Sequence, residues 1–238
     1  MSTPQYTGFG TATQTAAQFD AGLRKHMLSV FNYMGLGLAV TGIVAMFVAS
    51  TPAIYQPIFG TPLKWVVMLA PLAFVFFFSF KIETMSASTA QTAFWAFCGV
   101  MGLSMASIFL VFTGTSIART FFISATMFGA TSLYGYTTQR DLSRMGSFLI
   151  MGLIGVVIAS LVNIFLGSSI LQFAISIIGV LVFTGLTAYD TQNIKEQYAE
   201  NYGAESLTKL AVFGALSLYL NFVNIFQLLL NLTGQREE

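Results

Sequence analysis

The chain contains long apolar stretches that are almost free of charged residues, and this feature restricts its fold more than any other. Seven stretches are long enough for a bilayer-crossing helix, which takes about 20 mostly apolar residues. They cover about residues 28–50, 63–80, 90–112, 117–136, 147–166, 170–190 and 209–232. Only 8% of all residues are charged, against roughly 25% in soluble domains. The sequence therefore predicts an all-α integral membrane protein with seven transmembrane helices.

The seven stretches leave no room for a second folded domain. Residues 28–232 are expected to form one seven-span membrane domain, followed by a C-terminal tail over residues 233–238. Residues 1–27 are rich in Thr, Gln and Ala, so a largely disordered N-terminal tail is expected, with an amphipathic end near "FDAGLRKHML". No cleavable signal peptide is expected, because the first apolar run is too long and starts too late.

The distribution of Lys and Arg predicts the orientation, because cytoplasmic loops of membrane proteins carry an excess of positive charge. Seven of the ten basic residues fall on the side of the N terminus. They are Arg24, Lys25, Lys81, Arg140, Arg144, Lys195 and Lys209, against Lys64, Arg119 and Arg236 on the other side. The N terminus is therefore expected in the cytoplasm and, with seven spans, the C terminus outside.

Several classes of function conflict with the composition. A formal net charge of +1 excludes a strongly basic nucleic-acid binder. Cys98 and His26, the one cysteine and the one histidine, cannot form a four-ligand zinc site. An intramembrane aspartyl protease needs two carboxylates, and Asp190 is the one acid within the predicted spans. A Ser–His protease needs a histidine within a span, so we expect neither an enzyme nor a cofactor.

Polar side chains form a stripe on each of the last two predicted spans when these are placed on a helical wheel. The stripe of the sixth span contains Gln172, Ser176, Thr184, Thr187, Asp190 and Thr191, and that of the seventh contains Ser217, Asn221, Asn224, Gln227 and Asn231. Polar side chains are costly against lipid, so both stripes should face protein or water. Because the two spans are consecutive and antiparallel, the simplest arrangement lets the stripes meet.

Two interpretations of the stripes remain open. The Asn, Gln, Ser and Thr side chains can be hydrogen-bonding contacts between packed helices, each contributing about 0.6–2 kcal/mol. An ionisable residue in a span, however, suggests function. With Asp190, the two stripes suggest a hydrophilic path that has a titratable residue near its cytoplasmic end.

Motifs along nearly the whole chain, from about residue 20 to 232, resemble the Bax inhibitor family, and most closely its bacterial branch with a short N-terminal tail. The most specific motif is "GLTAYDTQNIKEQY" around the sixth span. The others are "DAGLRKHMLSVFNYMGLGLAVTG", "MSASTAQTAFWAF", "GYTTQRDLSRMGSFLIMGLIG" and "GALSLYLNFVNIFQLLL".

The resemblance implies seven helices with the seventh at the centre, and a pH-sensitive calcium leak through a path between the sixth and seventh spans. In the family, two aspartates share a proton and control the pore. Asp190 matches the first, whereas Asn221, in "LYLN", stands where family members commonly have the second in "LYLD". Thr184, Thr187, Ser217 and Asn224 are further candidate residues of the ion path.

The departure at Asn221 has physical consequences. Two close carboxylates titrate as a coupled pair, and an Asp–Asn pair loses that coupling. The amide can donate a hydrogen bond to the ionised carboxylate, which favours the charged form, while desolvation opposes it. Calcium prefers several oxygen ligands, so any calcium contact at Asp190 should be weak and rich in water. No resident metal site is assigned.

The family pattern also includes a basic residue of the second span that reaches the acid of the sixth span as a latch. Lys81 is the candidate for that role, and a plain positive-inside anchor is the alternative interpretation.

A second function belongs to a different class. Bacterial members of the family include a modulator of a membrane-anchored ATP-dependent protease. The chain is thus also a candidate for a regulator that transports nothing and binds such a protease or another membrane partner through its N-terminal tail. Either function places it, surrounded by membrane lipids, in what we expect to be a bacterial inner membrane. Calcium flux into liposomes that contain only this protein separates the two functions.

Overall fold

A computed structural model describes residues 8–81, 84–199 and 202–237, and nearly all of these residues are helical. The helices are α1 (Gly8–Ala49), α2 (Pro52–Phe59), α3 (Leu63–Lys81), α4 (Ala87–Val111), α5 (Gly114–Thr137), α6 (Ser143–Leu166), α7 (Ser169–Glu196) and α8 (Ala204–Thr233). A helix satisfies its backbone hydrogen bonds within one segment, as lipid requires. The predicted all-α class is confirmed.

Short connections with capping residues separate the helices. The side chains of Ser86, Thr113 and Ser168 accept hydrogen bonds from backbone N–H groups in the first turns of α4, α5 and α7. These caps satisfy donors that a helix leaves free at its N terminus. Helix α6 ends at Gly167, whose φ of 61° is readily adopted only by glycine. These four boundaries therefore follow from local sequence.

Within the part of the chain that the structure describes, five helices are long and apolar enough to cross a membrane: α4, α6, α7, α8 and the part of α1 from Gln18 to Ala49. Helices α2 and α3 meet at an angle of 89° and together make a sixth candidate if the bent pair counts as one span. Helix α5 is not a candidate, because Arg119 and many Thr and Ser residues lower its hydropathy. The structure thus supports a membrane protein with five to six candidate spans, against the seven that the sequence predicts.

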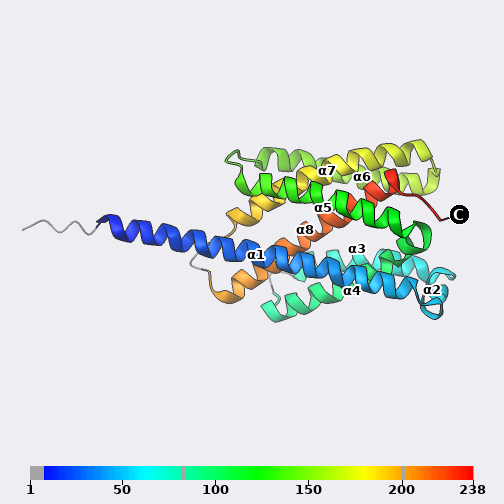
Figure 1. The fold of residues 1–238 in the computed structure, drawn as a ribbon, viewed down its shortest axis with the longest axis horizontal. Helices are drawn as coiled ribbons and strands as arrows, with labels where there is room; N and C mark the ends of the chain where they lie inside the picture. The colour runs from blue at the N-terminus through cyan, green and yellow to red at the C-terminus, as the bar shows by residue number, and fades with distance from the viewer. Residues whose placement is uncertain (1–7, 82–83, 200–201, 238) are drawn as a thin grey trace, which may run out of the picture.

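The long helices form two groups joined by α8. Helix α4 packs on α1 and α3, and α7 packs on α5 and α6. Helix α8 contacts α1, α4, α5 and α7, and Figure 1 shows it crossing obliquely between the two groups. Among the candidate spans α8 has the largest buried share, 61% of its most apolar window. Side chains of α8 therefore reach both groups.

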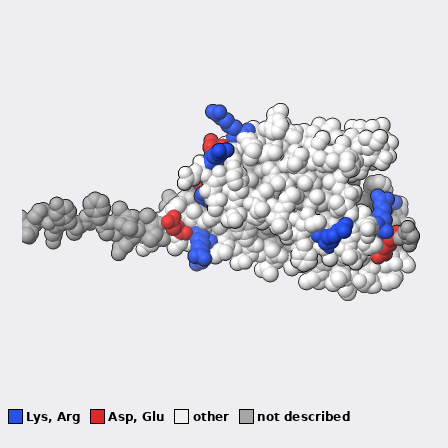
Figure 2. Space-filling model, turned by 45° about the horizontal axis from the view of Figure 1, so that its top comes forward, with Lys and Arg blue, Asp and Glu red and all other residues white. Residues whose placement is uncertain are grey.

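The surface has the pattern expected of a protein in a bilayer. On the face drawn in Figure 2, Lys, Arg, Asp and Glu lie toward the two ends, with a broad band of other residues between them. Large apolar side chains are exposed on the outer helices, including Phe122, Phe148 and Leu181. Many large apolar side chains exposed together are unfavourable in water but favourable in lipid.

Helix α1 differs from the prediction for the N-terminal segment. Residues 8–27 are part of α1, where the sequence predicted a largely disordered tail, and residues 1–7 lie outside the described residues. A segment of Ala, Gln, Leu and Arg that continues an existing helix has no nucleation to overcome. In addition, Leu23 and Met27 are buried one turn apart and fix residues 23–27 of α1 to the bundle.

The C-terminal segment after α8 is paired with the connection between α4 and α5. The backbone N–H of Thr113 donates to Gln235, and that of Glu237 donates to Val111, each over 3.0 Å. Phe112 and Arg236 form an isolated antiparallel bridge. The end of α8 is thereby fixed at the end of the bundle opposite the start of α1 (Figure 1).

Candidate functional site

Asp190 forms the main polar contact between α7 and α8. Its Oδ2 accepts a hydrogen bond from the Ser217 hydroxyl and another from the Asn221 amide, each over 2.7 Å. Ser217 and Asn221 are four residues apart on α8, so they lie one above the other on the same face of the helix. Asp190 lies in the last two turns of α7 and reaches both. The structure therefore brings together Asp190, Ser217 and Asn221, which the sequence assigned to the two polar stripes.

The contact contains one acid and no cation. Within the described residues no basic side chain forms an ion pair with Asp190, and both hydrogen bonds go to the same carboxylate oxygen. The other oxygen, Oδ1, accepts no hydrogen bond within the described residues. No group of three or more His, Cys, Asp or Glu able to hold a metal occurs in the described part of the chain. The Asp190 contact therefore offers few oxygen ligands.

The threonines of α7 form hydrogen bonds within that helix or contacts with α5. The hydroxyls of Thr184 and Thr187 donate to carbonyls of the preceding turn, and Thr184 also contacts the Met127 sulfur of α5. Thr191 is paired with Ser132 of α5 over 2.9 Å. The two predicted stripes thus meet at Asp190 and diverge elsewhere, and the structure does not bring Thr184 or Thr187 into the Asp190 contact.

Beyond Asn221, the polar stripe of α8 lines a cavity. This cavity has a volume of about 410 Å³ and lies between α3, α4 and α8. Its polar lining consists of Ser104, Ser107, Asn224, Gln227 and Asn231. Asn224 also donates to the carbonyl of Leu220, so its position is fixed by its own helix. The polar space next to α8 thus faces α3 and α4, whereas the sequence predicted a path between the sixth and seventh spans.

Lys81, the candidate latch, is not part of the Asp190 contact. It is the last residue of α3, its side chain is exposed, and within the described residues it forms no ion pair. Two other lysines bind backbone carbonyls across the same region: Lys195 donates to Tyr136 over 2.9 Å and Lys209 to Met85 over 3.1 Å. A latch role for Lys81 stays a prediction.

Two further polar contacts were not foreseen from the sequence. The side chain of Gln192 accepts from the N–H of Leu142 and donates to the carbonyl of Arg140, each over 2.8 Å, which fixes the α5–α6 connection to α7. Gln192 lies two residues after Asp190, and this proximity is the one feature of the sequence that points to a polar contact at Gln192. The other contact joins the hydroxyls of Thr41 and Tyr219 over 2.6 Å in the core. Thr41 is surrounded by apolar residues in the sequence, so nothing near it predicts the contact with Tyr219.

An all-helical chain with apolar spans, a charge-poor middle and a half-buried acid between two helices defines a polytopic membrane protein. Residues 23–238 match the model of the family described as "Inhibitor of apoptosis-promoting Bax1". The chain therefore belongs to the Bax inhibitor-1 family.

Full-length bacterial relatives support this membership. A protein of Rickettsia prowazekii is 48% identical over 98% of this chain and 99% of its own length. A Caulobacter vibrioides protein is 46% identical over 92% of each chain. The inner membrane protein YbhL of Escherichia coli K12 is 44% identical over 94% of this chain and 97% of its own length. The chain thus resembles these relatives over nearly its whole length.

Proposed function

We propose that this protein is a pH-sensitive cation leak, with calcium as the ion carried, and that Asp190 is its titratable gate residue. The observation that carries the proposal is the contact of Asp190 with Ser217 and Asn221. Both donors to the Asp190 carboxylate are neutral. When its charge changes with pH, no paired cation balances that change. Ionised, it attracts a cation; protonated, it does not.

The ion path that we propose follows the polar face of α8. It begins at the Asp190 contact, passes Asn221 and Asn224, and continues through the polar cavity that contains Gln227 and Asn231. Hydrophobic side chains such as Leu220 and Val223 also line this cavity. Because amide and hydroxyl oxygens are hard ligands for calcium but few in number here, the ion would keep much of its water.

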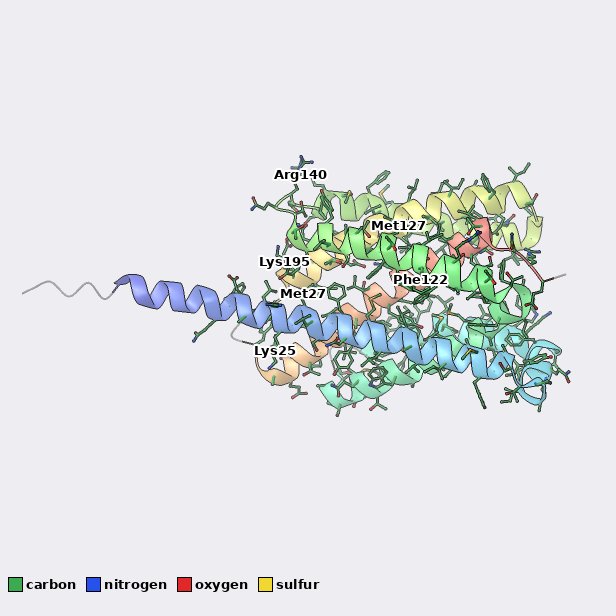
Figure 3. All side chains as sticks on the ribbon, viewed as in Figure 1. Lys25, Met27, Phe122, Met127, Arg140 and Lys195 are labelled. Atoms are coloured by element: carbon green, nitrogen blue, oxygen red, sulfur yellow. The ribbon has the colours of Figure 1, made fainter. Side chains whose placement is uncertain are left out.

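The proposed topology has seven spans, with the N terminus in the cytoplasm of a bacterium and the last span at the centre. Helix α5 has 24 residues, which at 1.5 Å per residue gives about 36 Å, enough to cross a hydrocarbon core of about 30 Å. It packs on α7 and α8, which are themselves candidate spans. Lys25, Arg140 and Lys195 lie at the same end of the bundle (Figure 3), which supports the positive-inside orientation.

Reconstitution tests the proposal directly. The purified protein is placed in liposomes that contain a calcium indicator, and influx is measured at several pH values between about 5 and 8, because the charge of a carboxyl group depends on pH. We expect influx above that of empty liposomes, with a rate that depends on pH. Influx equal to that of empty liposomes at every pH would exclude the leak.

A second candidate function is a regulator that binds a membrane partner such as a membrane-anchored protease. The observation in its favour is α1, whose N-terminal part projects from the bundle in Figure 1 as a free helix. A leak does not need this projection, whereas a contact with another protein can use it. Absence of flux together with a partner that cross-links to α1 would favour the regulator over the leak.

A further inference from the structure

The two groups of helices leave a groove between α1 and α5. Within the described residues these two helices barely contact each other, and α8 joins the groups (Figure 1). Two largely apolar cavities follow each other along the groove, with volumes of about 560 and 500 Å³. Met27 of α1 lines the first and Phe122 of α5 lines the second (Figure 3). The rings of Phe128 and Phe222, with centroids 5.7 Å apart, connect the two linings.

The first cavity has the length of one leaflet of a bilayer. On α1 its lining runs from Arg24 to Gly35, which at 1.5 Å per residue gives about 16 Å. This is about half of a hydrocarbon core of about 30 Å. Lys25 and Arg140 lie at the end of the bundle where this lining begins (Figure 3). The cavity therefore extends from that surface of the membrane to about its middle.

The shape of the first cavity suits an extended chain. Its lining is mostly apolar and includes Met27, Leu28, Phe31, Met34 and Leu133. Gly35 of α1 and Gly129 of α5 also line it, and a Cβ added at either glycine meets no atom within 4 Å. One turn of a helix with its side chains takes roughly 400–600 Å³, because a helix is about 10–12 Å across. A second helix therefore does not fit along the cavity, whereas an acyl chain is much thinner and fits.

Positive charge lies at the membrane-surface end of the first cavity. Arg24 lines the cavity and has an exposed side chain. Lys195 adds a second charge, since its ammonium lies 5.6 Å from the ring centroid of Tyr136, which also lines the cavity. The nearby acids Asp20 and Glu196 are exposed, and neither lines the cavity. Basic residues at a membrane surface attract anionic headgroups, and Tyr is typical of that depth.

We propose that the first cavity of the α1–α5 groove binds one acyl chain of an anionic phospholipid, with the headgroup phosphate at Arg24. The apolar chain fills a cavity of the length of one leaflet, and the phosphate meets the positive charge at its end. Such a chain also bridges α1 and α5, and so stabilises the contact between the two groups of helices. The proposal is independent of the leak, because neither Arg24 nor the glycines of the cavity belong to the Asp190 contact.

Photolabelling locates the lipid. The full chain in a maltoside detergent is mixed with phosphatidylglycerol that carries a diazirine near the end of one acyl chain, irradiated and digested, and mass spectrometry identifies the labelled residues. We expect labelling around Gly35 and Phe128, several-fold above that of the lipid-facing side of α6. Equal labelling of α1, α5 and α6 would show unspecific surrounding lipid and overturn the proposal. An unlabelled groove also overturns it, and a dimer linked through α1 and α5 would then assign the groove to a second copy.

A pair of glycine variants tests the cavity itself. Gly35→Leu places a side chain in the open space and should reduce labelling of the groove to the level of α6. It should fold, because an added Cβ there meets no atom within 4 Å and Leu favours a helix more than Gly. Gly155→Leu is the matched control, since Gly155 of α6 has equally open space. It should be labelled in the groove like the parent. Parental labelling of the groove in folded Gly35→Leu would contradict the proposal.

A pair of charge variants tests the headgroup. Unlabelled phosphatidylglycerol competes with the photoreactive lipid, and Arg24→Gln should weaken this competition about fivefold, as expected for one basic residue near an anionic membrane surface. Competition by zwitterionic phosphatidylethanolamine should not change. Lys64→Gln removes a charge of α3 that does not line the cavity, and should behave like the parent. Equal competition in Arg24→Gln and the parent would exclude the headgroup from Arg24 and overturn the proposal.

Discussion

At the scale of single residues, the Asp190 contact depends on which hydrogen-bonding groups the two helices supply. The Ser217 hydroxyl and the Asn221 amide both donate to Oδ2, so a neutral amide in place of the carboxylate can keep both contacts through its carbonyl oxygen. The charge of residue 190 can therefore be removed without removing the packing of α7 on α8.

Asp190→Asn should flatten the pH dependence of calcium influx between about pH 5 and 8, because the variant has no group at this position that gains or loses a proton. The measurement is the liposome flux assay at several pH values. A suitable control is Asp141→Asn, in the connection between α5 and α6. The hydrogen bonds from Ser143 lower the pKa of Asp141, so it stays ionised across this range. A folded Asp190→Asn protein with the parental pH profile would exclude Asp190 from the gate.

Asn221→Asp should make the pH response steeper and move its midpoint toward neutral pH. The new carboxylate would lie within hydrogen-bonding distance of Asp190, where two acids share a proton and titrate as a pair. Parent and variant are compared in identical liposomes. Asn231→Asp, which adds an acid on α8 at the far part of the cavity, is the control for added charge. Superimposable curves for parent and Asn221→Asp would show that the two positions do not titrate together.

At the scale of helices, glycines determine how closely α7 approaches its neighbours. A Cβ added at Gly135 of α5 would overlap the carbonyl oxygen of Ala188, and one added at Gly185 would lie 2.7 Å from the side chain of Leu149. Small residues permit such close approach of helices in membranes. The position of Asp190 opposite α8 thus depends on how α7 packs on α5 and α6.

Gly135→Ala should destabilise the protein by about 1–3 kcal/mol, because the added methyl group forces α5 away from the backbone of α7. Gly129→Ala in the same helix is the matched control, since a Cβ there meets no atom within 4 Å. It should be neutral or stabilising by up to about 1 kcal/mol. Thermal unfolding in one detergent compares both variants with the parent. Equal midpoints for the two variants would mean that α5 and α7 separate without cost.

At the scale of the whole molecule, the arrangement of α1 and α8 bears on topology. Helix α1 begins at one end of the bundle and α8 finishes at the other (Figure 1). A reporter that is active only in the cytoplasm, fused after Glu238, should therefore be silent, and the same reporter before Met1 should be active. A strong signal from the C-terminal fusion would contradict the seven-span topology with an N terminus in the cytoplasm.

The sequence by itself determined the membrane class, most helix positions, the family and the identity of the half-buried acid between α7 and α8. Hydropathy and helical periodicity are local properties, so Asp190 and Asn221 could be assigned to the inner faces of two adjacent helices. The boundaries of α4, α5 and α7 likewise follow from local caps.

Only the tertiary structure decided which helix each polar face meets. A helical wheel shows that Thr184 and Asn224 point away from lipid, but it does not show that Thr184 contacts α5 or that Asn224 lines a cavity between α3, α4 and α8. The same holds for Gln192, whose partners lie some 50 residues earlier in the chain. Such contacts depend on how several helices pack at once, and no single segment of the sequence contains that information.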